Sequence, residues 1–271
     1  MAVKRHKRRS KKGQSDFWWY VAIAFSVIIV GAAIWFITGL TKANRFDEAT
    51  LCHDGGPKNA YLVLLDLTDP LSATQSARLH AVIDKTVASL SVDTMIAFGV
   101  VSEDPTKWGV QFAKCKPETG AQASALYENP RQIAARYASE FTAPMKATLA
   151  GMMNGVVENQ SPIMEALQAL IAGTPDFIKV NGRKDILIVS DMLQHSDTVS
   201  FYRGQYWDYF TQSNGADRLA RNLNGVNISV LWISRAGASV PDRADVENFW
   251  GQYFDRQGSN PGIDEDYLGD L

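Results

Sequence analysis

A run of 24 uncharged residues, 17–40, constrains this chain more than any other feature. At a helical rise of 1.5 Å per residue the run spans roughly 36 Å, enough to cross a bilayer core of about 30 Å. It is apolar on every side, which argues against a helix that covers a soluble core with one face. Aromatic side chains mark both ends, as interfacial belts do, at Trp18, Trp19, Tyr20, Trp35 and Phe36. We therefore expect a transmembrane helix over residues 17–40.

A cleaved signal peptide is the competing interpretation of this run. Such a peptide has an apolar core of about 7–15 residues and a cleavage site with small residues. The apolar run here is longer, and the sequence that follows it, Gly39–Ala43, is a poor cleavage site. An uncleaved anchor is the favoured interpretation.

The charge distribution predicts the orientation of this anchor. Residues 1–16 hold seven Lys or Arg and one acid, Asp16. A tail of this composition cannot bury a core and should be disordered, and its charge places the N-terminus in the cytoplasm. Contact of the tail with nucleic acid or anionic lipid is the alternative. We expect a single-pass protein of a bacterial inner membrane, with residues 41–271 in the periplasm.

The rest of the chain carries 20 basic and 28 acidic residues. This acidic excess argues against nucleic-acid binding by the main body, because contacts to phosphates need a basic surface. The two cysteines, Cys52 and Cys115, both follow the membrane segment. In an oxidising compartment they should pair, and the disulfide would then attach the linker 41–57 to the domain. Two free thiols are the alternative.

From residue 58 onward, segments typical of strands alternate with segments typical of helices. Strands are expected at Ala60–Leu67, Thr94–Val101, Trp108–Lys114, Asp185–Ser190 and Val226–Ser234, and helices at Ser72–Leu90, Pro130–Gly151, Ser161–Gly173, Arg243–Arg256 and part of Phe201–Asn222. This alternation predicts an α/β domain over residues 58–257, with a Rossmann-like, mostly parallel sheet flanked by helices. Residues 258–271 are expected to be an acidic tail.

Three polar loops should meet at the edge of such a sheet where the parallel strands end. They are 66–72 (DLTDPLS), 159–162 (NQSP) and 190–192 (SDM). Their carboxylates and hydroxyls are hard oxygen ligands, which suit Mg²⁺, Mn²⁺ or Ca²⁺ and not zinc. Other roles are open for these residues, because Asp66 could cap the following helix and Ser161 before Pro162 is a good N-cap. His195 is most simply a loop residue, and the aromatic residues between 202 and 210 more often pack inside than bind a partner.

Over residues 58–257 the chain resembles the von Willebrand factor type A (vWA) family. Members carry a metal-ion-dependent adhesion site built from D-x-S-x-S after strand one, a Thr in a later loop and an Asp after strand four. Asp66 matches the first acid, Thr68 the first hydroxyl, Ser161 the loop hydroxyl of T-P-I-x-x-A-L, and Asp191 the later acid. Pro70 occupies the third D-x-S-x-S position and cannot ligate through its side chain, so Asp69 and Ser72 are the candidate replacements. The resemblance implies a bound Mg²⁺, Mn²⁺ or Ca²⁺ whose open position is filled by an acidic side chain of a protein partner.

Three functions follow from these patterns. The first is a membrane-tethered vWA-like binding module that assembles or regulates an envelope complex, and the resemblance implies that it depends on a divalent metal. The second is a metal-dependent phosphohydrolase of the haloacid-dehalogenase type, with Asp66 as nucleophile and Ser190 in its second motif. That class needs paired acids on a later strand end, whereas the last expected strand ends in Ser234 and Arg235. The third is a metal-free scaffold.

Overall fold

The computed structural model describes residues 13–43, 46–121, 129–154, 157–234, 241–260 and 262–268. The chain divides into two compact units, residues 1–46 and residues 47–271. The first unit contains one helix, α1 (Gly13–Ala43), whose segment Trp18–Phe36 is long and apolar enough to cross a membrane. A signal sequence would meet the same two criteria. The basic tail lies largely outside the described residues.

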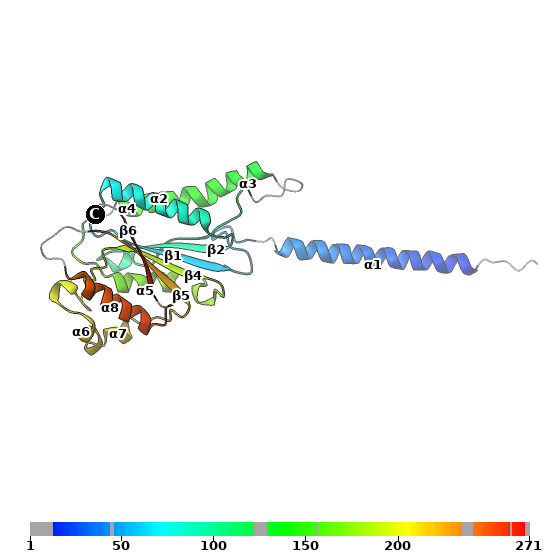
Figure 1. Ribbon diagram of the computed structural model, residues 1–271. Coiled ribbons are helices and arrows are strands. Elements are labelled where there is room, and N and C mark those ends of the chain that lie inside the picture. The colour runs from blue at the N-terminus through cyan, green and yellow to red at the C-terminus, as the bar shows by residue number, and fades with distance from the viewer. Residues whose placement is uncertain are drawn as a thin grey trace, which may run out of the picture. The chain divides into compact units, whose positions relative to one another are not determined.

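The second unit is built on a six-stranded sheet (Figure 1). Its strands are β1 (Asn59–Asp66), β2 (Thr94–Val101), β3 (Val110–Cys115), β4 (Lys184–Ser190), β5 (Val226–Trp232) and β6 (Ile263–Tyr267). The strand order is β3-β2-β1-β4-β5-β6. Only the β2–β3 pair is antiparallel, because a short loop joins these two strands while longer segments with helices join the others. The predicted α/β class is confirmed.

Helices cover both faces of this sheet (Figure 1). On one face lie α2 (Ala73–Ser89), α3 (Pro130–Arg136), the π-helix η2 (Tyr137–Thr142) and α4 (Ala143–Met153). On the other lie α5 (Ile163–Gly173), α6 (Trp207–Gln212), α7 (Gly215–Arg218) and α8 (Arg243–Arg256). Three 3₁₀ turns complete the described elements: η1 (Pro105–Lys107), η3 (Phe177–Lys179) and η4 (Phe201–Arg203).

The central strand β1 shows how the sequence specifies two cores. Leu62 and Leu64 pack into the core on the α5 and α8 side, while Val63 and Leu65 pack into the core under α2 and α4. Successive side chains of a strand point to opposite faces, and a strand covered on both faces is therefore apolar throughout. This burial fixes the register of β1 and places its last residue, Asp66, at the carboxyl edge of the sheet.

Two segments differ from the sequence-based expectation. The helix expected over Pro130–Gly151 is interrupted by η2, in which the amide of Ala143 donates to the carbonyl of Ala138, five residues earlier. Pro144 explains the interruption, since it has no N–H and its ring crowds the carbonyl four residues before it. The acidic segment expected as a tail contains β6, which pairs with β5. Leu268, the residue after β6, is fully buried, while the acidic side chains of β6 face solvent. The burial of Leu268 explains why this segment forms a strand.

Candidate functional site

Asp66 is the centre of a buried polar cluster at the carboxyl edge of the sheet. It is the last residue of β1 and only 1% exposed. Parallel pairing of β1 with β4 aligns Leu65 with Val189, so the next residues, Asp66 and Ser190, are also neighbours across the sheet. The alternative that Asp66 caps the following helix is wrong, because the N-cap of α2 is Ser72.

Three hydroxyl groups, from the end of β4 and from two loops, donate to the Asp66 carboxylate. Its Oδ1 accepts from the hydroxyl of Thr68 at 2.8 Å. Its Oδ2 accepts from Ser161 at 2.9 Å and from Ser190 at 2.7 Å. All three hydroxyl-bearing residues are buried. Hydrogen bonds to a charged acceptor are about twice as strong as neutral ones, so the carboxylate joins the ends of β1 and β4 to the loop before α5.

Ser161 belongs to this cluster and is not the helix cap that its sequence predicts. The N-cap position of α5 is Pro162, and no side chain caps the helix there, because the Ser161 hydroxyl is turned to Asp66. The backbone of Ser161 also exchanges two hydrogen bonds with that of His195, each 2.9 Å long. The loop after β4 is thereby attached to the loop before α5.

His195 lies at the rim of the cluster. Its Nδ1 is 2.8 Å from the hydroxyl of Ser200, and its ring makes an edge contact with Tyr202 at 5.5 Å between centroids. Burial lowers the pKa of His195, and the nearby charge of Arg203 acts in the same direction. The imidazole is therefore neutral at pH 7. Tyr202 is 55% exposed, so this part of the aromatic segment faces solvent instead of packing inside.

The second predicted acid, Asp191, follows directly after β4 and is half-buried. Its Oδ1 accepts from the amide of Leu193 at 3.0 Å. Asp191 also borders a cavity of about 190 Å³ between the ends of β4 and β5 and the start of α8. It is thus the more accessible of the two predicted acidic ligands.

The loop after β1 places the remaining predicted ligands differently. Ser72 is the N-cap of α2, and its Oγ accepts from the amide of Gln75 at 3.1 Å in a reciprocal capping box. Asp69 is half-buried and Pro70 is exposed. The amide of Glu158 donates to the carbonyl of Thr68 at 2.9 Å, while the Glu158 carboxylate accepts from Ser102 and Glu103 after β2.

The oxygen atoms of the predicted ligands are of the type that a hard cation binds, but few of them carry negative charge. Asp66 and Asp191 supply carboxylates, and Thr68 and Ser161 supply hydroxyls, which are ligands of the type Mg²⁺ and Ca²⁺ take. Within the described part of the chain, no group of three or more His, Cys, Asp or Glu has a metal-binding arrangement. Two carboxylates and two hydroxyls would leave water or a partner's oxygen to complete the six ligands such a cation needs.

Ser190 is the cluster member that the predicted ligand set omits. Its side chain is fully buried, and its Oγ also accepts from the amide of Met192 at 2.7 Å. The available signal was its position as the last residue of a buried strand expected to run parallel to β1. In such a pair the two terminal residues stand opposite each other, and a hydroxyl there needs a buried partner.

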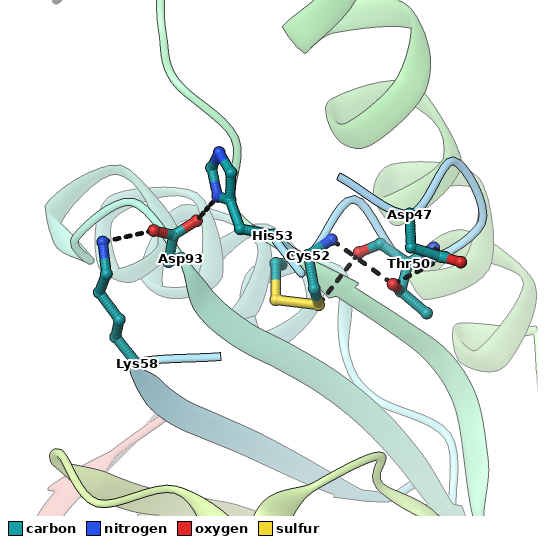
Figure 2. The surroundings of a disulfide bond; sticks show 7 residues. Asp47, Thr50, Cys52, His53, Lys58 and Asp93 are labelled. Atoms are coloured by element: carbon teal, nitrogen blue, oxygen red, sulfur yellow. Dashed lines mark hydrogen bonds and ion pairs between the residues drawn. A yellow bond between two sulfur atoms is a disulfide. The ribbon is translucent and has the colours of Figure 1, made fainter. Parts of the chain in front are cut away.

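The second predicted site, the disulfide, is confirmed. Cys52 and Cys115 are bonded across a sequence separation of 63 residues. Cys115 pairs with Met95 near the start of β2, so the bond lies at the amino edge of the parallel strands; Figure 2 shows its surroundings. Beside the disulfide, Asp93 is ion-paired with His53 and Lys58. Burial alone would raise the pKa of Asp93, but the hydrogen bonds from Lys58 and His53 outweigh it and lower that pKa.

Comparisons with known proteins find only distant similarities to solved structures. No protein-family model matches it, and no curated protein sequence matches it. A similar solved structure is an aerotolerance-related membrane protein of Bacteroides fragilis NCTC 9343 with multiple mutations to serine, at 12% identity and TM-score 0.38, with 77% of this chain and 89% of that chain covered. The SpRpn10 VWA domain matches at 10% identity and TM-score 0.38, with coverage of 79% and 90%.

A von Willebrand factor type A protein from Catenulispora acidiphila is also similar, at 12% identity and TM-score 0.37, with 78% of this chain and 39% of that chain covered. These similarities are too distant to support a conclusion about this chain. The vWA-like character of this chain rests on its own residues: a mostly parallel sheet covered on both faces, with Asp66, Ser161 and Asp191 at its carboxyl edge.

Proposed function

We propose that this protein is a membrane-tethered protein-binding module that uses the carboxyl edge of its sheet. The observation that carries the proposal is the Asp66 cluster. In it, the hydroxyls of Thr68, Ser161 and Ser190 all donate hydrogen bonds to one buried carboxylate. A surface for binding must hold its loops in one arrangement before the partner arrives, because ordering them on contact weakens binding. The neighbouring loop carries the exposed aromatic ring of Tyr202, and aromatic rings are common anchors in protein interfaces.

We further propose that the module works with a divalent cation, Mg²⁺ or in its place Mn²⁺ or Ca²⁺. Asp66, Thr68, Ser161 and Asp191 would hold it, and Asp69 or Ser72 would stand in for the ligand that Pro70 cannot supply. An acidic side chain of the partner would fill the open position. The N-cap role of Ser72 makes Asp69 the better of the two replacements, since the Ser72 oxygen already accepts the Gln75 amide.

The apolar helix α1 supports membrane anchoring. The seven basic residues before the apolar run support a cytoplasmic N-terminus, with the α/β domain in the periplasm of a bacterium. The disulfide is consistent with that compartment, because disulfides persist where the surroundings are oxidising. The module would then act in the assembly or regulation of an envelope complex.

A metal-free scaffold is the second candidate, and one observation favours it. Both carboxylate oxygens of Asp66 accept hydrogen bonds from protein hydroxyls, so the cluster is satisfied without a cation. The phosphohydrolase alternative has less support. A nucleophilic Asp66 must reach its substrate, whereas this side chain is buried under three hydroxyl donors. The later strand β6 does carry acids, but Glu265 and Asp266 are paired with Arg243 and Arg78.

Thermal unfolding of the full chain in detergent, with and without Mn²⁺, separates the first two candidates. A ligand at 100 times its Kd stabilises the folded state by about 2.7 kcal/mol. For a domain of this size that corresponds to a rise in Tm of roughly 5–10 °C. The cation-dependent module predicts this rise in the wild type and its loss in Asp191→Asn.

The matched control is Asp197→Asn, which removes an exposed acid from the same loop. This variant should retain the full rise in Tm. An unchanged Tm of the wild type in millimolar Mn²⁺, Mg²⁺ and Ca²⁺ would refute the cation-dependent module and favour the metal-free scaffold.

A further inference from the structure

The segment 47–58, which we call the strap, joins the end of the membrane helix to β1 and is fastened to the amino edge of the sheet (Figure 2). Few contacts besides the disulfide hold it. Leu51 is buried in the core under α2 and α4, and the carbonyl of Thr50 accepts from the amide of Cys115 at 2.7 Å. His53 and Lys58 bind the same carboxylate, that of Asp93.

The two sulfur-bearing residues differ in accessibility. Cys52 is 8% exposed and lines a cavity of about 490 Å³ between the strap and the turn around η3. Cys115 is fully buried and is not part of the cavity wall. The cavity is wide enough for a cysteine side chain of another molecule, so an incoming thiol meets Cys52 first.

We propose that Cys52 is a thiol–disulfide exchange site for a protein dithiol, and that reduction releases the strap from the sheet. A thiolate of the dithiol attacks Sγ of Cys52 and forms a mixed disulfide with it. The bond between Cys52 and Cys115 breaks, and Cys115 leaves as a thiolate that takes up a proton. The second thiol of the dithiol then attacks the mixed disulfide, loses its proton and frees the Cys52 sulfur, which is protonated in turn. The dithiol is oxidised to a disulfide, and the pair in this chain gains two electrons and two protons.

The backbone beside Cys52 explains why the strap depends on the bond. Leu51 has φ 58°, in the left-handed region that non-glycine residues rarely occupy and that persists only where surrounding contacts enforce it. Once the bond is broken, the buried side chain of Leu51 and two backbone hydrogen bonds, from Cys115 to Thr50 and from Lys58 to Asp93, remain. They must offset the conformational entropy of about twelve residues, which is the larger effect. The ion pairs of His53 and Lys58 with Asp93 add to these contacts, but both cationic side chains are partly exposed, so each pair adds less than a buried one would.

Release would change the length of the tether between membrane and domain, a consequence that rests on the proposed anchoring. Asp47 is the fourth residue after Ala43, the last residue of α1, and Asn59 is the sixteenth. At about 3.5 Å per extended residue the tether could reach at most about 14 Å with the strap bound and about 56 Å with it released. The redox state of the disulfide would then set how far the binding module extends from the membrane.

Two measurements on the full chain in detergent test this proposal. The first incubates the oxidised protein with glutathione and locates the mixed disulfide by mass spectrometry. We expect at least tenfold more adduct on Cys52 than on Cys115. The second follows hydrogen exchange before and after reduction by dithiothreitol. We expect the amides of Leu51, Cys52 and Cys115 to exchange at least tenfold faster after reduction and to lose their protection, while those of β4 remain protected.

Adduct found equally on both cysteines, or mainly on Cys115, would overturn the assignment of the exchange site. Unchanged exchange in the strap after reduction would overturn its release. Loss of protection in β4 and the strap together would do the same, because it would show that reduction unfolds the domain as a whole. None of these results depends on a cation or a partner, so they leave the proposed binding function to its own test.

Discussion

Replacing Asp66 by Asn tests the hydrogen bonds that the cluster makes in the absence of any cation. The change preserves the size of the side chain and its acceptor for Thr68, but it replaces the oxygen that accepts from Ser161 and Ser190 with an NH₂ group. Two hydrogen bonds to a charged acceptor, worth about 1.5–3 kcal/mol each, are lost. Reversed bonds from the amide to the two hydroxyls return about 0.5–1.5 kcal/mol each. We therefore expect a loss of about 2–3 kcal/mol in the free energy of unfolding.

The same substitution at Asp191 is the matched control. Asp191 is half-buried, and an Asn there can still accept from the amide of Leu193, so the expected cost is within about 0.5 kcal/mol. Urea unfolding of the full chain in detergent and chelator, followed by tryptophan fluorescence, measures both variants. Equal midpoints for Asp66→Asn and Asp191→Asn would refute the reasoning, because they would show that the Asp66 carboxylate is not a hydrogen-bonded centre.

Three further predictions concern other parts of the domain. Ser72→Ala removes the cap of α2 and should cost about 1 kcal/mol in urea unfolding; a cost near zero would contradict the capping role. Replacing both cysteines by Ala opens a loop of 63 residues and should lower the free energy of unfolding by up to about 4 kcal/mol in the same assay. An unchanged urea midpoint would contradict this prediction. The pKa of Asp93 is lower in the folded domain than in the unfolded chain, where it has the usual carboxyl value of about 4. The ion pairs of Asp93 therefore stabilise the domain fully above pH of about 4, and this stabilisation is lost as the pH falls through the lowered pKa. Asp93→Asn should flatten the acid limb of the stability–pH curve, and an unchanged limb would contradict that linkage.

The carboxyl-edge cluster was predictable because it depends on strand order and side-chain type. Parallel strands bring their carboxyl ends to one edge, so Asp66 and the loop around Asp191 had to be near each other once β1 and β4 were recognised. Ser161 was also placed correctly. The hydrogen-bond partner of Ser161 was not predicted. The Ser-Pro pattern predicts that the hydroxyl caps a helix, whereas in the structure it donates to the buried carboxylate of Asp66, which is the stronger acceptor.

The features that sequence reasoning missed depend on tertiary contacts. The acids of β6 suggest a solvated tail, and only the burial of Leu268 and pairing with β5 make that segment a strand. The interruption of the helix at η2 is different, because Pro144 was a signal for it in the sequence itself. The disulfide was predictable from compartment and cysteine count, but the unequal exposure of Cys52 and Cys115 was not, because the cavity is formed by the strap and the distant η3 turn.

The central claim is that the carboxyl edge of the sheet binds a protein partner with the help of a divalent cation. Its most direct test is partner capture by the detergent-solubilised full chain, with and without chelator, comparing the wild type with Asp191→Ala and with the control Asp197→Ala. In Mg²⁺ we expect the wild type and Asp197→Ala to retain a protein partner. We expect this partner to be lost from the wild type when the cation is chelated, and from Asp191→Ala even in Mg²⁺. Retention of the same partner by Asp191→Ala in chelator would contradict the claim.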